Sequence, residues 1–90
     1  MLIALICTDK KGALETRKTN RDAHLAYIAE TGVVMMAGPL LDGAGDMAGS
    51  LVILDVESTA DADNWAENDP YAKAGLFSDV RIQPWKKVIG

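Results

Sequence analysis

Cysteine and histidine each occur only once in this sequence of 90 residues. Cys7 has no second cysteine with which to form an internal disulfide, so we expect a protein of the reducing cytoplasm. One cysteine and one histidine also cannot supply any standard zinc site, and Asp42 and Asp46 do not have the spacing of a calcium-binding loop. We therefore expect neither a metal nor a cofactor.

Basic residues are also scarce. Nine lysines and arginines stand against 13 acidic residues, the net charge is −4 at pH 7, and the basic residues form no run. This charge and an aromatic content of 6% disfavour nucleic-acid binding. The sequence has neither a signal-peptide pattern nor an apolar run of about 18 residues, so we expect no membrane association.

Apolar residues, by contrast, are plentiful. They make up 49% of the sequence, and charged residues make up 24%, which is the composition of a globular protein. Folded domains usually have about 50 to 200 residues. We therefore predict one domain, residues 1–90, with one hydrophobic core.

Apolar runs and turn residues predict the element order βαββαβ. Gly32 is expected to cap the first helix in a left-handed conformation, and Gly38–Pro39 is expected to end the second strand. Ser58 begins a Ser-x-x-Asp capping signature for the second helix, which Asp69–Pro70 stops. The predicted strands are Leu2–Thr8, Val33–Ala37, Ser50–Val56 and Leu76–Val88, and the predicted helices are Ala13–Thr31 and Ser58–Asn68, followed by a short turn at Pro70–Gly75. This order predicts an α+β fold with an antiparallel sheet.

The predicted strands are apolar at nearly every position and not only at alternate positions. Leu2–Cys7 and Leu51–Leu54 show this pattern, so both faces of the sheet need cover. Two helices can cover only one face, and we expect a second copy of the chain to cover the other in a symmetric homodimer. The alternative is a ligand or a loop over that face. Met35 and Met36 are expected to be core residues, and Pro84 is expected on a sheet edge or bulge.

The first helix places charged residues beside its apolar stripe. At about 100° per residue, the predicted buried stripe consists of Leu14, Leu25 and Ile28. Arg21 falls within this stripe, and Arg17 and His24 lie on its border. A cleft for a carboxylate or phenolate would explain the arrangement, because guanidinium groups bind such anions and histidine titrates near neutral pH. The alternative is a surface histidine with arginines whose aliphatic parts cover apolar surface.

The second helix offers a carboxylate as a partner for this histidine. Asp69 prolongs the i, i+3, i+4, i+7 spacing that begins at Ala62, so its side chain is expected to face inward. There it would orient His24 and stabilise the imidazolium form. The alternative is a local role as the N-cap of a short helix, Pro70–Ala74. Both roles are compatible, because one carboxylate has several acceptor sites.

Four further features of the sequence are candidates for functional groups. Ser50 and Tyr71 are candidate hydrogen-bonding groups of a pocket, although a serine at a strand start and a tyrosine in a turn need no function. Gly43–Gly49 has the wrong spacing for a dinucleotide-binding loop and precedes a strand, so it is interpreted as a mobile hairpin loop. Cys7 lies in the most apolar strand and is interpreted as a buried, inert thiol.

Five segments together resemble the YCII-related (YciI-like) family in order and spacing. They are Arg21–Tyr27, Ala37–Leu40, Gly49–Ile53, Trp65–Tyr71 and Ile82–Val88, of which Trp65-Ala66-Glu67-Asn68-Asp69-Pro70-Tyr71 is the most specific. One departure is Asp22, where the family often has proline. This difference affects the start of the helix and is expected to leave His24 in place.

The resemblance implies a ferredoxin-like subunit of the dimeric α/β-barrel superfamily, similar to muconolactone isomerase. It also implies a pocket near a dimer interface with a His–Asp pair, which falls on His24 and Asp69. One known activity in the family is the dehydrochlorination of a chlorinated hydroxyhydroquinone, a lyase reaction on a small phenolic ring.

Two functions of different classes follow. In the first, the protein is a small-molecule lyase or isomerase in which His24, oriented by Asp69, transfers a proton, while Ser50 and an arginine hold a phenolate or carboxylate. In the second, the pocket only binds a small metabolite, and the homodimer is a non-catalytic accessory module. A hydrogen bond between His24 and Asp69 beside an open cavity would favour the first.

Overall fold

The computed structural model describes residues 1–90 and contains a four-stranded sheet and three helices. In chain order, the elements are β1 (Leu2–Asp9), α1 (Leu14–Thr31), β2 (Val34–Leu41), β3 (Met47–Asp55), α2 (Thr59–Asn68), α3 (Pro70–Lys73) and β4 (Phe77–Trp85). The strands lie in the order β2-β3-β1-β4, and all neighbours are antiparallel. The predicted α+β fold with ferredoxin-like order is confirmed, and the turn after α2 is formed as the short helix α3.

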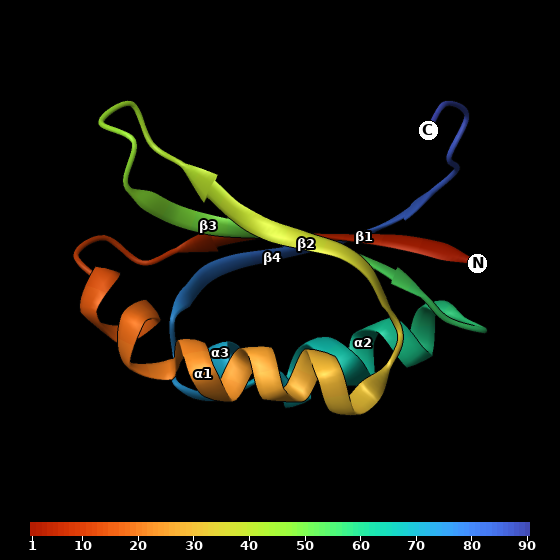
Figure 1. Cartoon of the computed structure of the whole chain (residues 1–90), viewed down its shortest axis with the longest axis horizontal. Coiled ribbons are helices and arrows are strands. Elements are labelled where there is room, and N and C mark those ends of the chain that lie inside the picture. Colours follow the sequence, from red (N-terminus) through yellow and green to blue (C-terminus); the bar gives the residue numbers. More distant parts are fainter.

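The helices all lie against one face of the sheet, and the opposite face is uncovered (Figure 1). The hydrophobic core fills the space between these two layers. Its buried members are Ile3, Leu5, Cys7, Val52, Leu54, Ala62 and Trp65. No helix of the chain is both long enough and apolar enough to cross a membrane.

Capping residues define the helix ends as the sequence predicts. Gly32 follows α1 with a φ of 65°, a left-handed conformation that glycine adopts at little cost. The Ser58 side chain accepts a hydrogen bond from the Asp61 backbone N–H at 3.2 Å, which satisfies a free donor in the first turn of α2. Asp69 ends α2 and caps α3, in which Pro70 takes the first position. These caps fix where the chain turns beneath the sheet.

Strand β2 is longer than predicted, because Gly38–Pro39 does not end it. The strand continues to Leu41, and Pro39 lies opposite Ser50 of β3. Proline lacks a backbone donor and is tolerated on an edge strand, which is the position of β2 in this sheet. Pro84 also lies on an edge strand, β4, as expected, although β4 ends at Trp85 and not at Val88.

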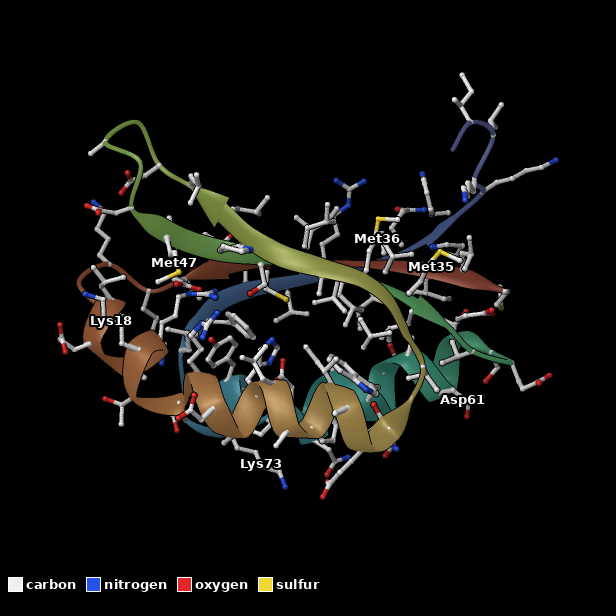
Figure 2. All side chains as sticks on the ribbon, viewed as in Figure 1. Lys18, Met35, Met36, Met47, Asp61 and Lys73 are labelled. Atoms are coloured by element: carbon white, nitrogen blue, oxygen red, sulfur yellow. The ribbon has the colours of Figure 1, made fainter.

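Apolar side chains remain exposed on the sheet face that the helices do not cover. Leu51 is 39% exposed, whereas its neighbours Ser50 and Val52, which point toward the helices, are buried. The prediction that Met35 and Met36 are core residues is wrong, since they are 45% and 51% exposed (Figure 2). The reason is that β2 lies at the edge and has no helix over its outer face.

Helix α1 buries polar residues where an apolar stripe was predicted. Its buried residues are Arg17 and His24, while Leu25 is 43% exposed. The prediction of a buried Leu25 is therefore wrong. The physical reason is that the inner face of α1 lies over a cluster of polar partners from β1, β3 and α3, so the charged side chains find their hydrogen bonds there and not in water.

Candidate active site

Arg17 is the centre of a buried polar cluster between α1 and the sheet. Its Nε and Nη2 atoms donate to the two carboxylate oxygens of Asp9 at 2.7 and 2.8 Å, and Nη2 also donates to Ser50 Oγ at 2.9 Å. The Arg17 and Asp9 side chains are only 3% and 5% exposed. Burial alone would lower the pKa of Arg17, but the hydrogen bonds and charge of Asp9 raise it above its ordinary value. Arg17 is therefore a fixed cation.

Asp9 is a member of this cluster that the sequence did not reveal. It directly follows the predicted first strand, Leu2–Thr8, and no motif in the sequence marks it as a partner of Arg17. The structure places it at the end of β1, at a register shift in the pairing of β1 with β4. The sequence did contain one signal for this pair. Asp9 is an acidic residue directly after an apolar strand, and Arg17 lies near the predicted buried face of the following helix.

Ser50 is held in place by the strand pairing. In β3 it lies opposite Cys7 of β1, and the preceding residue, Gly49, approaches β1 so closely that an added Cβ would collide with the Cys7 carbonyl oxygen. Because Arg17 can only donate, the Ser50 hydroxyl accepts that bond and keeps its own proton. That proton is available for an acceptor in the adjacent cavity.

His24 and Asp69 form a second buried pair. His24 Nδ1 lies 2.7 Å from Asp69 Oδ1, and the same oxygen accepts the backbone N–H of Tyr71 at 3.0 Å. The two roles weighed for Asp69, partner of His24 and cap of α3, are thus present together. His24 Nε2 has no hydrogen-bond partner in the protein. Because every fully buried side-chain nitrogen and oxygen has a partner, Nε2 is not fully buried, and it is open to the cavity that His24 lines.

Tyr71 joins the two pairs through its ring. The ring is stacked on the imidazole of His24 with centroids 3.9 Å apart, and the guanidinium carbon of Arg17 lies 4.8 Å from its centroid. Burial raises the pKa of Tyr71, although the charges of Arg17 and Arg21 oppose this rise. Tyr71 is therefore neutral near pH 7, and its ring fixes the plane of the imidazole.

These side chains line one wall of a cavity of about 170 Å³ between α1 and the β2–β3 half of the sheet. The lining residues are Arg17, Arg21, His24, Leu25, Ile28, Ala37, Gly38, Pro39, Met47, Ser50, Val52 and Tyr71. Asp9 and Asp69 do not line the cavity and support its polar wall from behind. An apolar cavity of about 150 Å³ is large enough for benzene, so this space suits a single substituted ring.

Arg21 has a different position from Arg17. It is exposed, forms no salt bridge and lies at the rim of the cavity. The structure brings five of the candidate residues together at this cavity, with Asp69 behind its wall: Arg17, Arg21, His24, Ser50 and Tyr71. Arg17 is engaged by Asp9 and Ser50, whereas Arg21 has its donors free to meet an anion.

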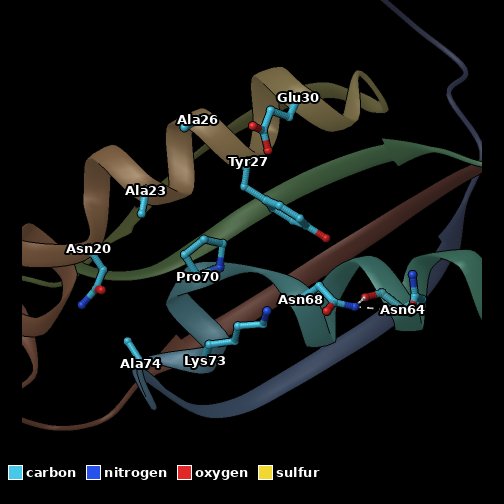
Figure 3. Close-up of a pocket in the computed structure, with 10 residues that line it drawn as sticks. All are labelled: Asn20, Ala23, Ala26, Tyr27, Glu30, Asn64, Asn68, Pro70, Lys73 and Ala74. Carbon is cyan, nitrogen blue, oxygen red and sulfur yellow. Dashed lines mark hydrogen bonds between the residues drawn. The ribbon is translucent and has the colours of Figure 1, made fainter.

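A larger hollow on the outer surface lacks these features. It is an open groove of about 920 Å³ between α1 and the α2–α3 segment, and Figure 3 shows its lining. Glu30 and Lys73 are its only charged residues, and Asn68 donates a hydrogen bond to Asn64 one turn earlier in α2. It contains no histidine and no buried carboxylate. The smaller cavity is therefore the better candidate for chemistry.

Cys7 lies near the cluster but is not available as a nucleophile. It is buried, and burial together with the charge of Asp69 raises its pKa to about 12. The reactive form of cysteine is the thiolate, which is negligible near neutral pH at this pKa. The sequence interpretation of an inert buried thiol agrees with this environment.

The fold and the cluster define a class of protein: a ferredoxin-like α+β subunit with a buried His–Asp pair beside a small, arginine-lined cavity. The chain belongs to the YCII-related domain family, which matches residues 1–86. A relative named Protein YciI, from Escherichia coli O6:H1, is 39% identical over 98% of this chain and 99% of its own length. An uncharacterized protein of Haemophilus influenzae is 33% identical over the same shares.

Solved structures share the fold. The 5-chloro-2-hydroxyhydroquinone dehydrochlorinase TftG from Burkholderia phenoliruptrix AC1100, in complex with 2,5-dihydroxybenzoquinone, has a TM-score of 0.88 and 36% identity. The alignment covers 96% of this chain and 94% of that chain. An antibiotic biosynthesis monooxygenase has a TM-score of 0.62 at 11% identity, over 99% of this chain and all of that chain. The latter likeness concerns the fold alone.

Proposed function

We propose that this protein is a cofactor-independent lyase or isomerase that acts on a small phenolic or carboxylic compound, with His24 and Asp69 as its acid–base pair. The observation that carries the proposal is the buried contact of 2.7 Å between His24 Nδ1 and Asp69, with Nε2 open to the cavity. A general acid–base histidine needs a fixed tautomer and one free nitrogen, and this arrangement supplies both.

The dehydrochlorinase supports a lyase-like role on a small molecule. TftG shares 36% of its residues with this chain, and its bound 2,5-dihydroxybenzoquinone is a single oxygenated ring. Such a ring matches the size of the cavity of about 170 Å³. We infer that the substrate here is also a single ring or a compound of that size, with oxygen substituents.

We propose a role for each residue of the polar wall. The Ser50 hydroxyl donates to a substrate oxygen, and the fixed charge of Arg17 favours the anionic form of that oxygen. The free guanidinium of Arg21 binds a second anionic group at the rim. His24 then moves a proton from a ring hydroxyl to the carbon that bears the leaving group. Chloride departs from that carbon with its bonding electron pair, and a second ring hydroxyl loses its proton as its oxygen becomes a carbonyl, so that the net loss is one molecule of HCl.

The test is an activity screen with 5-chloro-2-hydroxyhydroquinone and related small phenols. We expect His24→Asn and Asp69→Asn to lower kcat by roughly 100- to 10,000-fold, the usual contribution of a general acid–base group. Asp63→Asn, at an exposed position of α2, is the matched control and should retain full activity. If the wild type binds such phenols but turns over none, the protein is the non-catalytic metabolite-binding module instead.

The exposed apolar residues of the sheet support a further part of the proposal, a homodimer. Leu51 and Met36 expose apolar surface on the face without helices, and contiguous patches of this kind mark interaction sites. A second copy of the chain on this face, in the cytoplasm, gives the sheet a cover on both sides. Sedimentation of the purified protein tests this, and a monomer at all accessible concentrations would contradict it.

A further inference from the structure

Two segments leave the sheet at diagonally opposite corners. The pairing of β1 shows this. One end of β1, Thr8, pairs with Gly49, which pairs with Leu40 next to the β2–β3 hairpin. The other end, Leu2, pairs with Trp85, where the C-terminal segment begins. Strands β2 and β4 form the two opposite edges of the sheet. The hairpin segment 42–46 and the final segment 86–90 are thus separated by both the length and the width of the sheet.

Both segments rise on the same side of the sheet. In Figure 1 the β2–β3 hairpin and the C-terminal segment curve away from the helices, at opposite ends of the uncovered face. The face between them carries the exposed Leu51 and Met36. A partner that binds this face would therefore contact the hairpin at one corner and the C-terminal segment at the diagonally opposite corner.

The two segments have complementary chemistry. The hairpin carries Asp42 and Asp46 and begins beside Leu41, which is 63% exposed. The final segment carries two lysines, Lys86–Lys87, followed by two apolar residues, Val88–Ile89, that are 82% and 91% exposed. An acidic loop with an apolar base thus faces the same side as a basic segment with an apolar end.

We propose that, in the homodimer proposed above, the final segment 86–90 of each subunit binds the β2–β3 hairpin of the other. A two-fold axis along the other diagonal of the sheet exchanges the two corners and places each segment on its complement. The strands of the two sheets then cross, which is one of the two ways in which sheets pack face to face. The contact occurs twice, because a two-fold interface is self-complementary.

This contact reaches the cavity through the hairpin. Met47, the first residue of β3, pairs with Leu41 and also lines the cavity, as does Pro39 of β2. A partner segment packed on Leu41 therefore holds the strand ends that form the apolar wall opposite His24. In this arrangement each subunit helps to shape the pocket of the other.

Charge reversal tests the proposal without any substrate. We expect Lys86→Glu/Lys87→Glu to raise the dissociation constant of the dimer roughly tenfold at low salt, as measured by analytical ultracentrifugation. The reason is that two lysines in each of the two contacts, four in all, are replaced by charges that repel the acidic hairpin. Adding Asp46→Lys to that variant should recover part of the loss. Asp46 is chosen because the Asp42 carboxylate accepts two backbone N–H groups of its own turn. Lys73→Glu, an exposed charge change on α3, should leave dimerisation unchanged.

A second measurement follows the pocket wall. Deletion of residues 88–90 should shift the NMR signal of the Met47 methyl group, whereas Lys73→Glu should not. Dimers that are equally stable in all variants, or a loss that Asp46→Lys does not reverse, would overturn the proposed contact and leave the homodimer itself standing. Because neither readout uses turnover, a failed search for lyase activity has no bearing on the result.

Discussion

The layer between the helices and the sheet has two halves that are equally buried but chemically opposite. Under α2, Ile3, Leu54 and Trp65 form an apolar core, and under the first turns of α1 the interior is filled by Asp9, Arg17 and their partners. The named side chains of both halves are nearly inaccessible to water. Burial alone therefore does not distinguish the core from the candidate site, whereas the hydrogen-bond inventory does.

The two halves also differ in what they contribute to stability. Apolar burial contributes roughly 25 cal/mol per Å², whereas a buried ion pair recovers its desolvation cost only when the geometry is good and the remaining donors are satisfied. In this protein no buried side-chain nitrogen or oxygen lacks a partner. The polar half is thus tolerated because it is complete, and removal of one member should cost more than the pair contributes.

The largest effect is expected for Asp9→Ala, which leaves the Arg17 guanidinium buried without its main partner. We predict a loss of about 3–5 kcal/mol in the free energy of unfolding by urea denaturation. The double variant Asp9→Leu/Arg17→Met should recover most of this loss. Asp79→Ala, at an exposed acidic position of β4, is the control and should change stability by less than about 0.5 kcal/mol. A small loss in Asp9→Ala would contradict the view of a complete polar cluster.

In the apolar half, Leu54→Ala should reduce the free energy of unfolding by roughly 2–5 kcal/mol, because Leu54 is fully buried and its removal leaves a cavity. The polar half should not respond. The NMR signals of the His24 ring are expected to remain in place in this variant, and a clear shift would show that the two halves are coupled.

Cys7 lies where the halves meet, and its effect depends on pH. The thiol has a raised pKa of about 12 in the folded protein against an ordinary value of 9.0, so the folded state holds its proton longer than the unfolded state. The contribution of the Cys7 thiol to the free energy of unfolding is therefore fully present below about pH 9 and is lost as the pH rises toward 12. At pH 10.5 the wild type should have lost roughly 2 kcal/mol more than Cys7→Ala, relative to pH 8. Parallel pH profiles of the two proteins would refute this.

The smallest effect compares a helix cap in each half. Ser58→Ala should cost about 1 kcal/mol, since it removes only the cap of α2. Asp69→Ala should cost more, because the same change removes the cap of α3 and the partner of buried His24. Equal losses by thermal unfolding would indicate that the His24 contact has no structural weight.

The sequence predicted the local features of this molecule better than the long-range ones. Gly32 and Ser58 act within one turn of the chain, so their roles were legible from neighbouring residues. The prediction of an apolar buried stripe on α1 was wrong, because a helical wheel assumes an apolar partner for the buried face. Arg17 is instead buried against Asp9 and Ser50, which come from two different strands. The extent of β2 was missed because the tolerance for Pro39 depends on which strand lies at the sheet edge.

The candidate site was predicted in part for the same reason. His24 was the only histidine, and the helical spacing of Asp69 aimed its carboxylate inward, so both could be named. No local pattern shows that the ring of Tyr71 stacks on His24. That contact depends on the packing of α3 against α1, which the sequence alone does not specify.

Each outer strand of the sheet contains one proline, Pro39 in β2 and Pro84 in β4. Proline on an edge strand is one of the ways in which proteins avoid indefinite addition of further strands. Growth of the sheet sideways into fibres is thus disfavoured at both borders, even though one face exposes apolar side chains. In the proposed homodimer, association would use the face instead, where a two-fold contact closes on itself, and the edge prolines would then favour a finite assembly over aggregates.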